Sequence, residues 1–187
     1  TEMGRMLASQ DLEPLLSFYG TEQGQRIVGF EVAAREAFLD EAVKDAATEM
    51  SKAGRQNGTV LDSRITRFIE VNDLIDLNVE GHLRSNFAFM SGLVEGGAFD
   101  TSYTAEQLLA DVWAGEGAAR EETSEWLYAY LSTAFSPLSA EDLDDYIAFS
   151  GTDHGQAMNA AIMGAFDVLF VDISNRMGLA AAQFMGG

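Results

Sequence analysis

Apolar residues recur at steps of three and four along most of the chain, the spacing that places them on one face of an α-helix. The series Leu61, Ile65, Phe68 and Ile69 is the clearest example. No segment alternates strictly between apolar and polar residues with turn residues at both ends, the pattern that favours a β-strand. The sequence therefore predicts an all-α fold, and we expect a single domain over residues 1–187.

We expect about seven helices, which together form a bundle. The predicted helices cover residues 9–19, 21–53 with a break near Asp40, 61–95 with Gly81 inside it, 104–113, 126–135, 139–150 and 152–177. Glycines mark several of the gaps, as in the segment from Gly54 to Thr59. Thr104 and Gln107 stand three residues apart, as the two partners of a capping box do.

One segment of eight residues occurs twice, 131 positions apart. The segment 18–25 reads FYGTEQGQ, and 149–156 reads FSGTDHGQ. When the comparison starts at Asp11 and Asp142, seven of fifteen positions are identical. We therefore expect repeated elements at 11–39 and 142–170, one near each end of the chain. They are placed to pack together as a pseudo-symmetric pair.

Each copy is predicted to be a helix–Gly-Thr–helix corner. Its first glycine follows an apolar helix, where a left-handed residue commonly ends the helix. The threonine that follows is a favoured N-cap, and the next residue is an acid at the positive end of the new helix dipole. A second glycine, inside the new helix, indicates the close approach of another backbone segment. The predicted corner residues are Phe18, Gly20, Thr21, Gly24 and Gln25 in the first copy, and Phe149, Gly151, Thr152, Gly155 and Gln156 in the second.

A functional alternative exists for these corners. Exposed N–H groups at the start of a helix bind phosphate or carboxylate, so each corner is also a candidate anion or ligand site. Each copy already carries an acid at that point, and the second copy has no Lys or Arg. These features favour the architectural interpretation.

The chain has a formal net charge of -19, with 30 acidic residues against 11 basic ones. Nucleic acids bind proteins through clustered cations, so this charge excludes nucleic-acid binding. The same acidity favours basic or neutral partners. Cysteine is absent, which excludes disulfides, thiolate zinc sites and cysteine nucleophiles.

The most apolar segment, 157–171, contains Asn159 and Asp167. It is shorter than the about 20 apolar residues that a membrane-spanning helix needs. We therefore expect no membrane span. The chain begins at Thr1 without an initiator methionine, which is typical of a removed leader or a trimmed chain.

Residues 18–26, FYGTEQGQR, resemble the signature F-Y-x-[ST]-P-x-G-[QK]-[KR] of a bacterial domain-of-unknown-function family, the one numbered twenty fifty-nine. The residues that fit are Phe18, Tyr19, Thr21, Gly24, Gln25 and Arg26, with Phe149, Thr152, Gly155 and Gln156 in the second copy. Both copies depart from the family in having Glu22 or Asp153 where it has proline. The resemblance implies an exported helical protein, periplasmic or secreted, and supplies no activity. A cytoplasmic location stays open.

No arrangement of residues predicts a metal site, a cofactor site or a catalytic residue. His82 and His154 are the only histidines, and they lack the spacing of zinc ligands. The acidic run at 141–145 lacks the spacing of a calcium-binding loop and is interpreted as a solvated first helical turn. Motifs for a serine nucleophile, a phosphate loop or a dinucleotide are absent.

Several charged residues lie on apolar helices. Arg67 and Glu70 are three residues apart, and Glu31 and Arg35 are four apart, spacings typical of ion pairs on a helix surface. Asp167 lies within an apolar stretch, so it needs a partner if it faces the interior.

The Phe and Met residues at 87, 89, 90, 158, 163 and 177 fit either core packing or an adaptable apolar groove, and their helical spacing favours the core. We hypothesise a non-enzymatic binding or interaction module that recognises a protein partner or an apolar ligand. One alternative is a hydrolase-like enzyme whose helical cleft holds carboxylates such as Asp167 or Glu70 with His82. The other is a structural module that forms oligomers, such as a homodimer.

Overall fold

A computed structural model describes residues 1–98 and 104–185, and every regular element in these residues is an α-helix. The all-α fold class is thereby confirmed. The helices are α1 (Glu2–Met6), α2 (Glu13–Tyr19), α3 (Glu22–Ala37), α4 (Glu41–Asn57), α5 (Val60–Val71), α6 (Leu74–Glu95), α7 (Ala105–Ala114), α8 (Glu116–Phe135), α9 (Ala140–Ser150) and α10 (Asp153–Met185). The capping box predicted at Thr104 and Gln107 is present at the start of α7.

The described residues form ten helices, not about seven. One added boundary lies before α4, where the Asp40 carboxylate accepts from the Ala42 N–H. Another separates α5 from α6, where Asp73 adopts a left-handed conformation with φ of 50° and so interrupts the helix. The third added helix is α1, whose five residues are too few for a periodic pattern to reveal. The helix expected to begin near Trp126 begins ten residues earlier, at Glu116.

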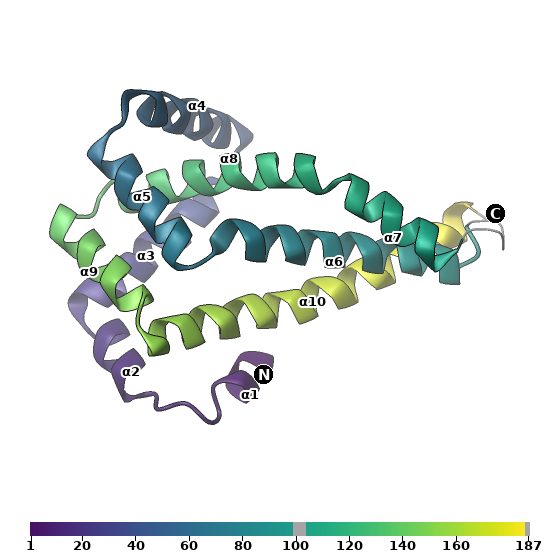
Figure 1. Ribbon diagram of the computed structural model, residues 1–187, viewed down its shortest axis with the longest axis horizontal. Coiled ribbons are helices and arrows are strands. Elements are labelled where there is room, and N and C mark those ends of the chain that lie inside the picture. Colours follow the sequence, from purple (N-terminus) through teal and green to yellow (C-terminus); the bar gives the residue numbers. More distant parts are fainter. Residues whose placement is uncertain (99–103, 186–187) are drawn as a thin grey trace.

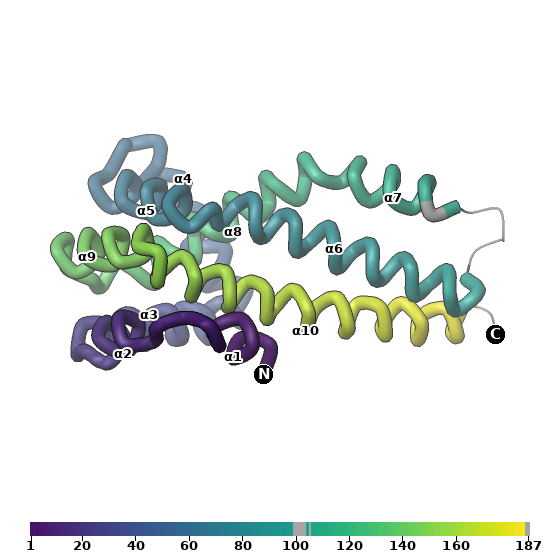
Figure 2. Tube along the Cα trace, turned by 60° about the horizontal axis from the view of Figure 1, so that its bottom comes forward, coloured from purple at the N-terminus to yellow at the C-terminus, as the bar shows by residue number. Residues whose placement is uncertain are grey.

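Figure 1 shows an elongated molecule in which α6 and α10 run side by side, in the same direction, over most of its length. At one end, α2, α3, α5 and α9 gather around the beginnings of these two helices. α8 returns toward that end and packs on α3, α4, α5 and α6. Figure 2 shows α1 lying beside α10, which it contacts.

The main core lies at the gathered end, among α3, α5, α8 and α9. Its largest fully buried side chains include Ile27, Ile65, Leu131, Phe135, Leu143 and Ile147. Burying a side chain of this kind stabilises the fold by about 1.5–3 kcal/mol. The core therefore fixes the gathered end, from which α6 and α10 project.

Glycines let α6 and α10 touch backbone to backbone. A Cβ atom added to Gly92 would collide with the carbonyl oxygen of Asn175. A Cβ atom added to Gly178 would collide with the carbonyl oxygen of Phe89 and lie 3.0 Å from the backbone nitrogen of Leu93. Only glycine permits so close an approach, so these two positions fix how the helices pair.

α10 overturns the expectation of no membrane span. Its 33 residues extend about 50 Å, more than twice the length of the 15-residue apolar segment 157–171. By length and composition the helix is able to cross a membrane, and only 6% of its most apolar 18-residue window is buried in the described structure. The prediction was wrong because the helix continues through Asp172 and Arg176, which pair with each other at 3.0 Å across one helical turn.

Candidate functional site

The two predicted corners contain matching hydrogen bonds. At the first corner the Gly24 N–H donates to the Thr21 hydroxyl oxygen at 3.0 Å, and that hydroxyl donates to the carbonyl three residues back at 2.7 Å. At the second corner the Gly155 N–H donates to the Thr152 hydroxyl oxygen at 3.1 Å, and the second bond is again 2.7 Å. Each threonine thus caps the start of one helix and binds the end of the preceding one.

The glycines of the corners serve close contact and not a left-handed turn. Gly20 and Gly151 end α2 and α9 with φ of -77° and -78°, so the left-handed ending predicted for them is wrong. A Cβ atom added to Gly24 or Gly155 would collide with a carbonyl oxygen of the preceding helix and lie 2.8 Å from a Cα atom. The threonine caps therefore turn the chain, and the second glycine of each copy makes room for the turn.

The glutamines that end the repeated segments bind backbone carbonyls. The Gln25 amide donates to the Tyr19 carbonyl oxygen. The Gln156 amide donates to the carbonyl oxygens of Ser150, at 2.7 Å, and Val71, at 2.9 Å. Both side chains are thus used in holding the corners, and the second copy also reaches the end of α5.

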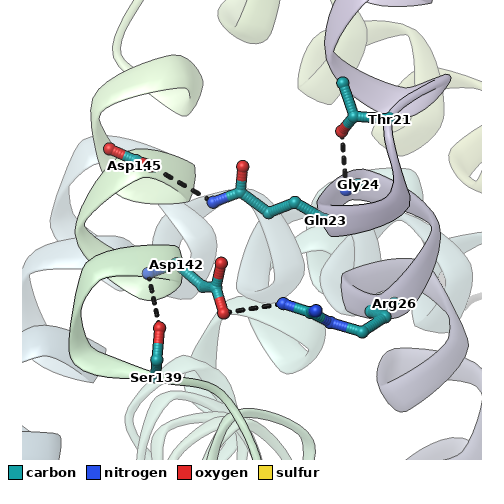
Figure 3. Close-up of polar contacts among 7 residues, drawn as sticks. All are labelled: Thr21, Gln23, Gly24, Arg26, Ser139, Asp142 and Asp145. Atoms are coloured by element: carbon teal, nitrogen blue, oxygen red, sulfur yellow. Dashed lines mark hydrogen bonds and ion pairs between the residues drawn. The ribbon is translucent and has the colours of Figure 1, made fainter.

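The first corner is joined to α9 by polar contacts, drawn in Figure 3. Arg26 of α3 pairs with Asp142 at 2.8 Å, and the Gln23 amide donates to the Asp145 carboxylate at 3.2 Å. Ser139 caps α9 by accepting from the backbone N–H of Asp142 at 3.0 Å. The acidic run at 141–145 is therefore more than a solvated first turn, because it holds α3.

The two corners also touch each other. The rings of Phe18 and Phe149 stack with 4.0 Å between centroids and 3° between planes. Tyr146 stacks on Phe18 from α9 at 5.8 Å. Aromatic contacts of this kind contribute about 0.5–1.5 kcal/mol beyond the area that they bury.

A solvent-open groove of about 1340 Å³ extends from the gathered end along α6, α8 and α10. Its volume exceeds the about 300–1,000 Å³ of a small-molecule pocket. Aromatic residues line it throughout: Phe68, Trp126, Tyr130, Tyr146, Phe166 and Phe170. The charged residues of its lining are Glu31, Asp45, Asp73, Glu80, Glu122, Glu125 and Asp167 against Arg35, Lys44 and Arg84. The groove is therefore both aromatic and predominantly acidic.

Glu31 is a half-buried carboxylate that lines this groove. It stands on α3, and the Tyr146 hydroxyl of α9 donates to its Oε1 at 3.1 Å. The Tyr130 hydroxyl of α8 donates to the Glu31 backbone carbonyl at 3.0 Å. Tyr19 of α2 adds a third phenol, which interacts with Tyr146. Three helices thus bring tyrosine side chains to one residue of α3.

The burial of Glu31 changes the pKa of its carboxyl group. It raises the pKa of the Glu31 carboxyl to about 7, although the Tyr146 hydrogen bond and the charge of Arg35 act in the opposite direction. Burial also raises the pKa of Tyr146 well above its ordinary value, and the nearby Glu31 charge adds to that effect. The pKa of Tyr130 is raised for the same two reasons. Glu31 is therefore a group that changes charge near neutral pH.

Arg35 does not form the expected ion pair with Glu31. Its guanidinium lies 5.3 Å from the ring centroid of Tyr130 and 5.9 Å from that of Trp126, and these two rings stack on each other at 4.9 Å. Cation–π contacts of this kind favour a guanidinium by about 0.5–1 kcal/mol at exposed sites. Arg35 is thereby drawn toward the aromatic pair of α8.

Two of the three residues proposed for a hydrolase-like site do reach the groove. Asp167 faces α6, where it binds Arg84 at 3.2 Å, and Arg84 also binds Glu80 at 2.7 Å. His82 lines the groove from α6. Glu70 lies on the exposed side of α5 and outside the groove lining.

The ion pair expected between Arg67 and Glu70 is replaced by a longer-range contact. Arg64, one turn earlier on α5, binds both oxygens of Asp144 at 2.8 Å. This pair ties α5 to α9 and lowers the pKa of Asp144.

The wall that α10 contributes to the groove continues into an exposed apolar stripe. The stripe consists of Phe166, Leu169, Phe170, Ile173, Met177 and Phe184, which share one helix face. Between 41% and 86% of each side chain is exposed. Phe166 and Phe170 stack at 5.8 Å and also line the groove. The stripe therefore begins in the groove and leaves it toward the end of α10.

The Met and Phe residues named from the sequence divide between core and surface. Phe87 packs against the small cluster of Val79, Leu83 and Val112. Met163 lines the groove, and Met177 is 59% exposed within the stripe. The groove residues that the sequence did not reveal are Glu31 as a buried acid and the Trp126–Tyr130 pair. Helical spacing cannot show that α8 and α9 cover the Glu31 side of α3.

Comparison with known proteins adds no relative: neither a family model nor a curated protein nor a solved structure matches the chain.

Proposed function

We propose that the protein is a non-enzymatic binding module whose groove accepts a basic, amphipathic helical segment of a partner protein. The observation that carries the proposal is the groove of about 1340 Å³ that opens onto the exposed stripe of α10. Amphipathic helices bind such surfaces by laying an apolar face into a groove.

Size and charge both support a helical peptide over a small ligand. The groove is larger than typical small-molecule pockets. Seven acidic side chains against three Lys or Arg side chains line it. Complementary charge selects partners and raises association rates, so a cationic segment is the favoured occupant of an acidic groove.

The apolar side of the partner would face α10. The stripe leaves six large apolar side chains exposed on one helix face, and contiguous exposed apolar patches mark interaction sites. Phe166 and Phe170 connect this stripe to the groove, so one amphipathic helix could contact both surfaces at once.

An 18-residue helical peptide of Lys and Leu, with Leu at i, i+3, i+4 and i+7, tests the proposal. Its matched control replaces every Lys by Glu. Binding is measured at about 0.15 M salt, where long-range charge effects are screened. The signal is Trp126 fluorescence in a Trp113→Phe background. We expect the Lys peptide to bind at least about tenfold more tightly than the Glu peptide.

Phe166→Asp is expected to weaken binding of the Lys peptide about tenfold or more, because it places a charge in the apolar wall. Leu39→Asp is the matched surface control, since Leu39 is 86% exposed and outside the groove lining. Equal weakening by the two variants, or equal binding of the two peptides, would overturn the proposal.

Membrane association of α10 is a second candidate. It is favoured by the length and composition of the helix, of which only 6% of the most apolar window is buried. Phosphatidylcholine vesicles are the suitable probe, because the net charge of -19 opposes anionic lipid. If α10 inserts, the protein floats with these vesicles and Ile173→Asp abolishes flotation. Recovery in the vesicle-free fraction would reject this function.

We also propose that the segments 11–39 and 142–170 are two copies of one unit. Matching threonine caps, matching glycine contacts and the Phe18–Phe149 stack support this. The resemblance at 18–26 supports work in the periplasm or outside the cell, which fractionation of native cells would test.

A further inference from the structure

The carboxylate of Glu31 lines a groove that is open to solvent but has no ion-pair partner in the part of the chain that the structure describes. Tyr146 donates to one of its oxygens, and within the described residues no Lys, Arg or His lies within ion-pair distance of either oxygen. Glu31 also lines the groove, so a ligand in the groove can reach it. A half-buried acid without an ionic partner gains most from a cation that is brought to it.

We propose that Glu31 is the recognition site for an organic cation, an alkylammonium or guanidinium group carried by the ligand of the groove. The inference rests on the binding function proposed above and names the group that this function recognises. Such a cation would contact the Glu31 carboxylate on α3 and the aromatic rings of Trp126 and Tyr130 on α8.

The surroundings of Glu31 suit an organic cation better than a metal ion. The phenols of Tyr19, Tyr130 and Tyr146 and the charge of Arg35 act on it, and the indole of Trp126 lines the same groove beside Arg35. Aromatic faces attract cations, and a single carboxylate is too few ligands for a divalent metal. No group of three or more His, Cys, Asp or Glu in the described residues is arranged to hold a metal ion.

Arg35 sets the strength of this site. Its guanidinium rests over Tyr130 and Trp126, so the aromatic pair holds the resident cation apart from Glu31. Its positive charge still opposes a second cation nearby. Removing that charge should therefore strengthen cation binding.

The protonation of Glu31 makes cation binding depend on pH. Only ionised Glu31 attracts a cation, and burial raises the pKa of its carboxyl to about 7. Affinity must therefore rise with pH through this range. The ionised fraction changes about tenfold between pH 6 and pH 8, and the apparent affinity changes by the same factor.

The test uses n-hexylammonium, with 1-hexanol as the neutral probe of the same length. The titration of Glu31 is followed by carbon-13 NMR of its side-chain carboxyl, assigned by difference from Glu31→Gln. We expect saturating hexylammonium to lower the midpoint of this titration by about one pH unit or more, because an opposite charge nearby favours the ionised acid. Hexanol should leave the midpoint unchanged. Equal effects of the two probes, or no shift with either, would overturn the inference.

Two variants separate recognition from a structural role. Arg35→Gln should strengthen hexylammonium binding several-fold, whereas a purely structural Glu31 predicts no gain. Glu31→Gln keeps the acceptor for Tyr146 and should abolish the pH dependence of binding.

The peptide assay distinguishes this inference from the proposed function. If hexylammonium binds at Glu31 and the Lys peptide does not bind, the cation site stands and the helix-binding function falls. If the Lys peptide binds equally well to the wild-type protein and Glu31→Gln, the function stands and the cation site falls.

Discussion

The segments 11–39 and 142–170 share their corner residues and differ beyond them, including at two aligned positions that line the groove. Glu31 and Arg35 of the first copy align, at an offset of 131 residues, with Ile162 and Phe166 of the second. All four residues line the groove. At these two positions the first segment presents charged side chains and the second apolar ones, while the threonines and glycines of the two corners keep the same contacts.

The comparison separates residues that shape the chain from residues that meet a ligand. The shared residues turn the chain, and a change there disturbs the fold. The residues that differ lie one to three helical turns beyond the corner, where the direction of the helix is already fixed. A groove lined by both charged and apolar side chains fits a partner whose own faces differ in the same way.

The largest expected effect is the loss of stability caused by adding a methyl group to a corner glycine. Gly24→Ala is expected to destabilise the protein by about 2 kcal/mol or more, because the Cβ atom would collide with the Phe18 carbonyl oxygen. Gly155→Ala should have a similar cost, since its Cβ atom meets the equivalent carbonyl of Phe149. Urea unfolding followed by circular dichroism measures both changes.

Gly29→Ala is the matched control for Gly24→Ala on the same helix. A Cβ atom at Gly29 meets nothing within 4 Å. Alanine is the better helix former, so this variant should be more stable by up to about 1 kcal/mol. If the two variants are equally stable, the corner glycines are not required by contact.

The second effect concerns Glu31 and the dependence of the protein's stability on pH. The ordinary pKa of a glutamate is 4.5, and that of Glu31 in the fold is raised to about 7. Between these values the folded protein holds a proton that the unfolded chain has released, so stability falls as pH rises through this window. Relative to Glu31→Gln, the wild-type protein should lose about 2 kcal/mol of unfolding free energy between pH 5 and pH 8.

Urea unfolding at pH 5, 6, 7 and 8 measures this difference. Glu36→Gln, an exposed glutamate of the same helix, is the control and should track the wild-type protein at every pH. A constant difference between the wild-type protein and Glu31→Gln would contradict the buried position assigned to this acid.

The smallest expected effect concerns the residue that directly follows each corner. Arg26 binds Asp142, whereas the aligned position in the second copy is Ala157. The Arg26 side chain is 47% exposed, so a double-mutant cycle of Arg26→Gln with Asp142→Asn should give a coupling below about 1 kcal/mol that shrinks in salt. A larger coupling would show that this contact, absent from the second copy, helps to hold the corner.

Helix formation and several helix starts could be predicted from the sequence because these signals are local. The capping box at Thr104 and the break near Asp40 depend on side chains within a few residues of the helix end. The break at Asp73 could not be predicted, because neither glycine nor proline marks its left-handed conformation. The length of α10 was underestimated because Asp172 and Arg176 compensate each other along the helix.

The candidate site was largely hidden from the sequence. Glu31 and Arg35 fit a surface ion pair by spacing, and only the return of α8 and α9 shows otherwise. The residues that cover Glu31 are about one hundred positions away, at Tyr130 and Tyr146. No local pattern reports a contact over that distance.

The glycine contact between α6 and α10 limits how the groove can change shape. Because Gly92 and Gly178 bring the two backbones together, rotation or sliding of α10 would drive main-chain atoms into each other. α3 is held as well, because Ile27, Ala34 and Phe38 are buried in the main core. Neither α10 nor α3 is therefore free to shift, so a bulkier ligand has to be accommodated by changes of side-chain rotamer within the groove.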